Sequence, residues 1–196
     1  MLRLDNLLER WTEIYAPMQH NPSDSARPEE KAFFLIDRWA EQNEFQRTFN
    51  LLQKPSLIYC TTIEAQLADN KPKQVEYQYN WYLAIKQRQS ANPVIDDDGA
   101  RMAKLDLNDM MIDLLAYLFT LSDFASGRKL PKDTPQSVLD ITATLTVEDI
   151  QGIRGLRLEK TSWWSAPAYK NGWWLMGVEL EGLDPRQLCI IPDRYV

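Results

Sequence analysis

Two runs of alternating side chains, separated by a short polar segment, constrain the fold of this chain more than any other feature. In residues 76–86, EYQYNWYLAIK, the odd-numbered positions are apolar or aromatic and the even-numbered positions are mostly polar. Residues 57–67, LIYCTTIEAQL, alternate as well, and DNKPK at 69–73 has the composition of a turn. Successive side chains of a strand point to opposite faces, so the two runs predict an antiparallel hairpin with one buried face.

Three segments have the apolar spacing of a helix. The first covers residues 2–15, where Leu4, Leu8 and Trp11 share a face. The second is predicted from Pro28 through KAFFLIDRWAEQNEF to a stop before Pro55, because proline and acidic residues suit a first helical turn. The third covers about 104–124 and ends before Gly127 and Pro131. Its apolar stripe comprises Leu107, Met110, Met111, Leu114, Tyr117, Leu118 and Leu121.

The last third of the chain is predicted to be rich in strands. Residues 138–147, VLDITATLTV, alternate, a further strand is expected from about Leu156, and a hairpin turns at Asn171-Gly172. The element order is then ααββαβββ. We therefore expect an α+β fold with a mostly antiparallel sheet and about three helices packed on it. One domain is expected over 1–196, with 1–27 as a helical N-terminal extension and 28–196 as the core.

Charge and apolar content argue against nucleic-acid and membrane binding. Acidic residues outnumber basic ones by 28 to 22, and no basic stripe stands out, so affinity for phosphates or an anionic bilayer is not expected. The first residues, MLRLDNLLERW, lack the apolar run of a signal peptide, and the most apolar window, 110–121, is too short to cross a bilayer. Cys60 and Cys189 have no CxxC partner. A reduced, cytoplasmic setting follows.

The residues that usually carry catalysis or bind metals are not arranged in any recognised pattern. His20 is the single histidine and lies in a segment of Asn, Pro and Ser, so we expect it to be exposed and non-catalytic. Cys60, Cys189 and His20 lack zinc spacing. The three adjacent acids of DDDG, 96–99, favour a solvated loop over a calcium site, with weak divalent binding as the alternative. We predict no catalytic residues, no cofactor and no metal site.

The tryptophan pairs of residues 161–182 are the most distinctive candidate surface. Trp163 and Trp164 must point to opposite faces of a strand, as must Trp173 and Trp174. Trp174 shares the more apolar face with Met176, Val178 and Leu180, and is predicted to lie in the core. Trp173 shares a mixed face with Leu175, Gly177 and Glu179, and is predicted to cover a helix or to meet a neighbouring subunit. The predicted subunit interface comprises Trp163, Trp164, Trp173 and Tyr82.

The order of these elements resembles the tail-terminator family of tailed phages, and related rings of contractile injection machines. The resemblance runs from about residue 28 to 182. It rests on a helix before the aromatic hairpin of 57–86, the central helix of about 104–124, and later strands ending in the KNGWW hairpin. The chain differs in its extra N-terminal helix and in its tail, LCIIPDRYV.

The resemblance implies a non-enzymatic structural protein that caps a tail tube and joins it to the head or sheath. It implies a homo-oligomeric ring, a hexamer, whose partners are tail-tube, sheath or neck proteins. Assembly would take place in the cytoplasm, and the ring would become part of a virion or injection particle. An acidic lumen would let DNA pass without specific binding.

Two alternatives come from other classes of protein. A carbohydrate-binding or other ligand-binding module would use the Trp163–Trp174 hairpin as a stacking platform, with polar residues beside it. A small hydrolase would need a pocket into which carboxylates converge.

Overall fold

The structure, a computed structural model, describes residues 3–37, 47–48, 50–61, 63–67, 75–86, 97–167 and 173–183. Four α-helices and six strands lie in this part of the chain. The helices are α1 (Leu4–Ile14), α3 (Asp97–Ala125), α4 (Gln136–Ala143) and α5 (Val147–Arg154). The strands are β1 (Phe33–Ile36), β2 (Ser56–Cys60), β3 (Glu64–Leu67), β4 (Val75–Lys86), β5 (Ser162–Pro167) and β6 (Trp173–Leu183). The predicted α+β class is confirmed.

The described strands form one sheet in the order β1-β2-β4-β6-β5, and β3 pairs with β4 beside β2. β2, β3 and β5 pair antiparallel with β4 or β6, and β4 pairs antiparallel with β6 from Glu76↔Leu183 to Lys86↔Trp173. β1 runs parallel to β2. The hairpin predicted for 57–67 and 76–86 is confirmed, with a break after Cys60 that separates β2 from β3. The sheet as a whole is mixed, which corrects the mostly antiparallel prediction.

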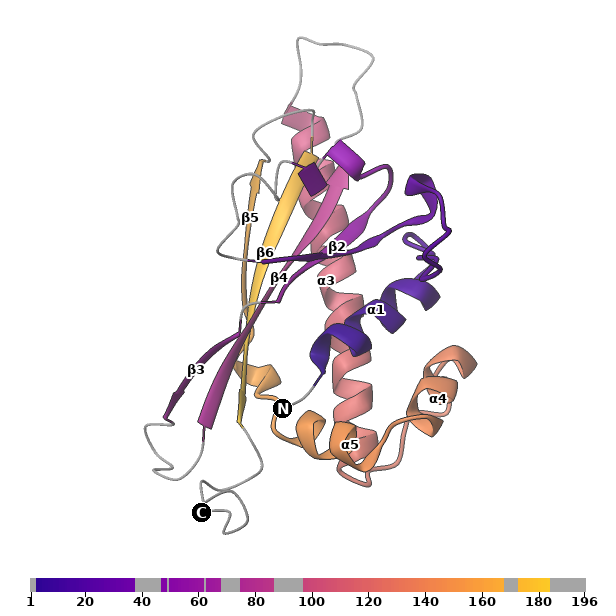
Figure 1. Ribbon diagram of the computed structural model, residues 1–196, viewed down its shortest axis with the longest axis vertical. Coiled ribbons are helices and arrows are strands. Elements are labelled where there is room, and N and C mark those ends of the chain that lie inside the picture. The colour runs from indigo at the N-terminus through magenta and orange to yellow at the C-terminus, as the bar shows by residue number, and fades with distance from the viewer. Residues whose placement is uncertain are drawn as a thin grey trace, which may run out of the picture.

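One face of the sheet carries the helices, and the main core lies between them (Figure 1). The long helix α3 runs the length of the sheet. All seven residues of its predicted stripe are buried there, against the inner face of β4 and β6. The inner residues of β6 are Trp174, Met176, Val178 and Leu180, as predicted. A smaller cluster on the opposite face contains Ile36, Leu52, Ile58, Cys60, Ala84 and Trp173.

The N-terminal helix α1 is built into the main core. Leu4, Leu7, Leu8 and Trp11 are buried in that cluster. The Tyr117 hydroxyl on α3 donates to the Leu7 carbonyl at 3.1 Å. Tyr15, after α1, donates to the Asp113 carboxylate at 2.9 Å. The segment predicted as an extension therefore shares one core with the rest of the described chain.

The helix predicted from Pro28 to before Pro55 is wrong over its first part. Pro28–Glu30 form a short 3-10 helix, η1, whose Glu30 side chain accepts from the Arg27 backbone N–H. The chain then extends into β1, and the Ala32 carbonyl accepts from Leu57 N–H at 2.8 Å. Pairing with β2 overrides the local helical signal, and the FFLI sequence of β1 suits a strand. Residues 47, 48, 50 and 51 are helical, and residues 38–46 and 49 of the prediction lie outside the described part.

The strand predicted for 138–147 is also wrong, because these residues form α4 and the start of α5. Val138, Ile141, Thr142 and Leu145 are spaced i, i+3, i+4 and i+7, so the same sequence fits both periods. A capping box decides the start of α5: Thr146 Oγ1 accepts from Asp149 N–H at 3.1 Å, and Asp149 accepts from Thr146 N–H at 3.0 Å. The strand expected from Leu156 is a single bridge to Gly182, followed by a 3-10 turn, η3 (Leu158–Lys160), before β5.

Candidate functional site

The Trp-rich hairpin predicted from the sequence forms, with β5 as the last described strand on its side of the sheet. Its turn at Asn171-Gly172 lies outside the described residues. Trp163 is 46% exposed and Trp164 is 50% exposed. Trp163 pairs with the core residue Val178, so it points to the helix-bearing face, whereas Trp164 pairs with Gly177 and points to the open face. The edge of the sheet thus presents one indole on each face.

The Trp164 ring lies directly over the backbone of Gly177. A Cβ atom built on Gly177 would come within 2.5 Å of this ring, so no larger residue fits there without moving the indole. The glycine leaves a flat backbone surface on β6, and the ring of the neighbouring strand covers it. Half of the indole stays accessible, in a position fixed by packing on a strand.

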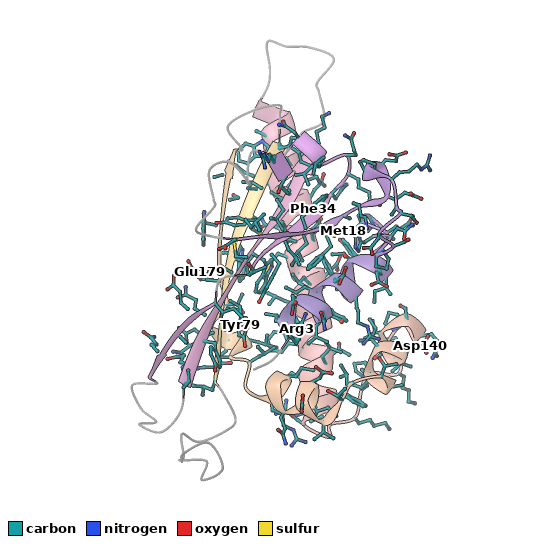
Figure 2. The ribbon with its side chains drawn as sticks, viewed as in Figure 1. Arg3, Met18, Phe34, Tyr79, Asp140 and Glu179 are labelled. Atoms are coloured by element: carbon teal, nitrogen blue, oxygen red, sulfur yellow. The ribbon has the colours of Figure 1, made fainter. Side chains whose placement is uncertain are left out.

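A cavity of about 250 Å³ lies beside this ring on the open face of the sheet. Cys60, Asn80, Tyr82, Trp164 and Glu179 are among the residues that line it. Asn80 and Glu179 are directly opposed on β4 and β6. Figure 2 shows Glu179 on the side of the sheet away from α1. The cavity therefore combines an aromatic wall with an amide and a carboxylate.

The other two residues of the predicted interface lie elsewhere. Trp173 is 4% exposed and packs with Ile36, Ile58 and Leu52 in the smaller cluster. This corrects the prediction that Trp173 meets a neighbouring subunit, because its own chain covers the ring. Tyr82 is half-buried, packs against the same cluster and lines the cavity. Of the four predicted residues, Trp163 and Trp164 form the exposed edge.

His20 is buried, and the prediction of an exposed histidine is wrong. Its Nδ1 accepts from Ala32 N–H at 3.1 Å, and its Nε2 lies 3.4 Å from the Glu9 carboxylate. The backbone N–H of His20 donates to the Thr12 carbonyl. Burial lowers the pKa of His20, against the opposing effect of Glu9, which raises it. The neutral ring thus joins α1 to the start of β1, which is a structural role.

An ion-pair cluster joins the other end of the sheet to the turn before β5. Arg157 Nη1 lies 2.7 Å from Glu76 Oε1 and 3.3 Å from Glu181 Oε2. Lys160 Nζ lies 2.9 Å from the same Glu181 oxygen. The hydrogen bond from Lys160 is the largest of the effects that lower the pKa of Glu181. Arg157 Nε also lies 3.9 Å from Glu159 Oε1, so two cations meet three carboxylates, and the contacts of Arg157 and Lys160 join β4, β6 and η3.

The described residues hold neither a cluster of metal ligands nor a membrane-spanning helix. Within the described ranges, no three His, Cys, Asp or Glu side chains gather closely enough to hold a metal ion. Of the DDDG segment, Asp96 lies outside those ranges, and α3 begins at Asp97, which corrects the predicted loop at that point. No helix in the part of the chain that can be described is long and apolar enough to cross a membrane.

Comparison with protein-family models, with curated proteins and with solved structures found no match for this chain. The cavity residues Asn80 and Glu179 were not singled out from the sequence. A signal for them exists, since the alternation of 76–86 and 173–180 places both on the face opposite the core.

Proposed function

We propose that this protein is a non-enzymatic structural assembly protein that forms a ring of identical subunits. In the form that the resemblance to tail terminators suggests, the ring caps a tail tube and joins it to a head or sheath. Its partners are then further copies of itself and tail-tube, sheath or neck proteins. The observation that carries the proposal is the pair of half-exposed indoles, Trp163 and Trp164, on the outermost described strand of the sheet.

Aromatic side chains at an accessible, rigid position are typical of protein interfaces. A strand at the edge of a sheet also offers unpaired backbone groups to another chain. Closing a ring requires two different surfaces on each subunit, because the contact is head to tail. The described sheet has such a pair: β5 at one end carries the indoles, and β1 at the other end carries the exposed Leu35.

A mixing experiment tests this arrangement by light scattering over a concentration series. The unmodified protein is expected to grow toward a closed ring. Trp163→Ser and Leu35→Ser should each weaken association by about tenfold or more, since a buried interface anchor contributes upwards of about 1.4 kcal/mol. With Ile112→Ser also present in both variants, to exclude any pairing through the exposed face of α3, an equimolar mixture has one intact head-to-tail contact and should form one-to-one dimers.

Val147→Ser provides the matched control, because Val147 is exposed on α5, away from both sheet edges. It should associate like the unmodified protein. A chain that stays monomeric at high concentration, and that Trp163→Ser leaves unchanged, would contradict the proposal.

The cavity beside Trp164 favours a second candidate, the binding of a small polar ligand such as a sugar. The cavity offers an indole face on which a sugar ring can stack, and an amide and a carboxylate that can form hydrogen bonds with its hydroxyl groups. A glycan screen with the unmodified protein and Trp164→Ala distinguishes the two functions. Binding that Trp164→Ala abolishes, with no self-association, would favour the ligand-binding module.

A further inference from the structure

The long helix α3 carries a second apolar stripe, on the face opposite to the one buried in the core. Leu105, Ile112 and Phe119 are seven residues apart and are 46%, 61% and 47% exposed. Met102 is exposed at the margin of the same stripe, and Asn108 and Ala116 are exposed between its members. Three large apolar side chains in one line, spread over about 20 Å at a rise of about 1.5 Å per residue, form a patch rather than isolated exposures.

The order of side chains along this stripe is symmetric about Ile112. From Arg101 to Asp123 this face runs Arg101, Leu105, Asn108, Ile112, Ala116, Phe119 and Asp123, and all but the partly buried Asp123 are exposed. The steps between them are 4, 3, 4, 4, 3 and 4, so the spacing is the same in both directions. Two pairs of positions match in kind: Leu105 and Phe119 are both apolar, and Arg101 and Asp123 carry opposite charges. The pair between them, Asn108 and Ala116, does not match in polarity.

From this symmetry we infer that α3 pairs with α3 of a second copy, antiparallel, about a two-fold axis at Ile112. In that pairing Ile112 meets its own counterpart, and Leu105 of each copy meets Phe119 of the other. Arg101 meets Asp123 at both ends. A two-fold contact requires a surface that is complementary to itself, and this stripe meets the requirement in apolar contact, spacing and charge. A different partner protein would have no need of the symmetry.

The margins of the stripe shape the expected strength of the pair. Asp109 lies beside Ile112, on the side where Asp113 accepts the Tyr15 hydroxyl. Both aspartates are exposed, and in the pair those of the two copies approach each other at the solvated rim. Like charges at a rim weaken association only modestly in water. Asp109→Asn should therefore tighten the pair a few-fold.

This contact is separate from the one proposed at the β5 edge. It uses α3, so variants of the two surfaces report on different associations. Ile112→Ser should abolish the α3 contact and leave the head-to-tail contact intact, and Trp163→Ser should do the reverse. Failure of one proposal is thus distinguishable from failure of the other.

Cysteine cross-linking tests the two-fold axis directly. Ile112→Cys is made together with Cys189→Ser, since Cys60 is buried. Mild oxidation should link most of the protein as disulfide dimers, because only a residue on the axis faces itself. The matched control is Val147→Cys in the same background, at an exposed position off the stripe. Cross-linking of Ile112→Cys at no more than the control rate would overturn the inference.

Charge reversal provides an independent test by sedimentation equilibrium. Arg101→Asp and Asp123→Arg should each weaken dimerisation by about tenfold, and the double variant should restore it to within about threefold. Circular dichroism checks that each variant is folded, which matters because Asp123 also pairs with Arg128 at 2.9 Å in its own chain. A double variant as weak as the single ones would overturn the antiparallel register.

Discussion

At the scale of single residues, the buried His20 couples folding to pH. Its imidazole is neutral in the fold, since burial lowers its pKa below the ordinary value of 6.5. Between the ordinary pKa and the lower folded pKa, His20 is therefore protonated in the unfolded chain and neutral in the folded chain. Stability is fully present above the unfolded pKa and is lost as the pH falls through about 6.5 towards the lower folded pKa. No other histidine is present in the sequence to mask the effect.

His20→Asn tests this coupling. The amide oxygen can take the place of Nδ1 as acceptor for the Ala32 N–H, but it does not titrate. At pH 8 the variant should lose about 1–2 kcal/mol of unfolding free energy through the lost ring contacts and the lost bond to Glu9. Between pH 8 and pH 6 its stability should be nearly constant. Urea denaturation at both pH values checks this, and an unchanged pH slope in the variant would contradict it.

Within the ion-pair cluster, substitution of Arg157 is expected to lower the unfolding free energy most. Arg157→Ala leaves the nearly buried Glu76 carboxylate without its 2.7 Å partner and should cost about 2 kcal/mol of unfolding free energy. The matched control is Arg27→Ala, whose exposed side chain pairs with Glu29 and Glu30. Exposed pairs contribute little, so this control should be close to neutral in urea denaturation. Equal losses in the two variants would contradict the assignment.

At the scale of elements, capping residues determine where α5 begins and where α3 ends, which the apolar spacing alone does not determine. The TVED sequence at 146–149 is a capping box and begins α5 within a run that alternates like a strand. After α3, Gly127 takes a positive φ of 72°, and Arg128 N–H donates to the Asp123 carbonyl. This is the Schellman arrangement that glycine favours, and it ends the helix where the sequence predicted.

Thr146→Ala tests the capping box. It removes the acceptor for the Asp149 N–H and should cost about 1 kcal/mol of unfolding free energy. Thr120→Ala is the matched control, since Thr120 lies inside α3 and its hydroxyl donates to the Ala116 carbonyl. Alanine is the better helix former there, so the control should be neutral or slightly stabilising. Thermal unfolding compares the two, and a control that loses as much as Thr146→Ala would contradict the cap.

At the scale of the whole molecule, α1, α3 and the sheet share one core and should unfold together. Leu8→Ala removes a fully buried side chain of α1 and should cost about 3 kcal/mol. Fluorescence and circular dichroism should report the same single transition. Leu51→Ala, at an exposed position, should change stability by less than about 0.5 kcal/mol. Separate transitions would show that α1 is a detachable extension.

The sequence by itself determined the elements whose apolar spacing fits only one type of secondary structure. Alternating apolar residues at 76–86 predict β4, and alternating apolar and mixed faces at 173–180 predict β6. Apolar residues at helical spacing over 107–121 predict α3. Each of these patterns fits a single period. Trp163 and Trp164 are about half exposed, and their assignment to a subunit interface stays a prediction. The exposed apolar stripe on α3 is also readable in the sequence, at positions seven apart.

Only the tertiary structure decided the remaining features. The FFLI segment becomes β1 because β2 offers it a parallel partner, and 138–147 becomes helical because its apolar side chains, which fit both periods, meet α1 and α3. Trp173 is buried by Leu52, which is distant in the sequence, and His20 is buried where the chain returns from α1 to the start of β1, beside Glu9 and Ala32. Local spacing states which residues share a face, and burial depends on what the rest of the chain places against that face.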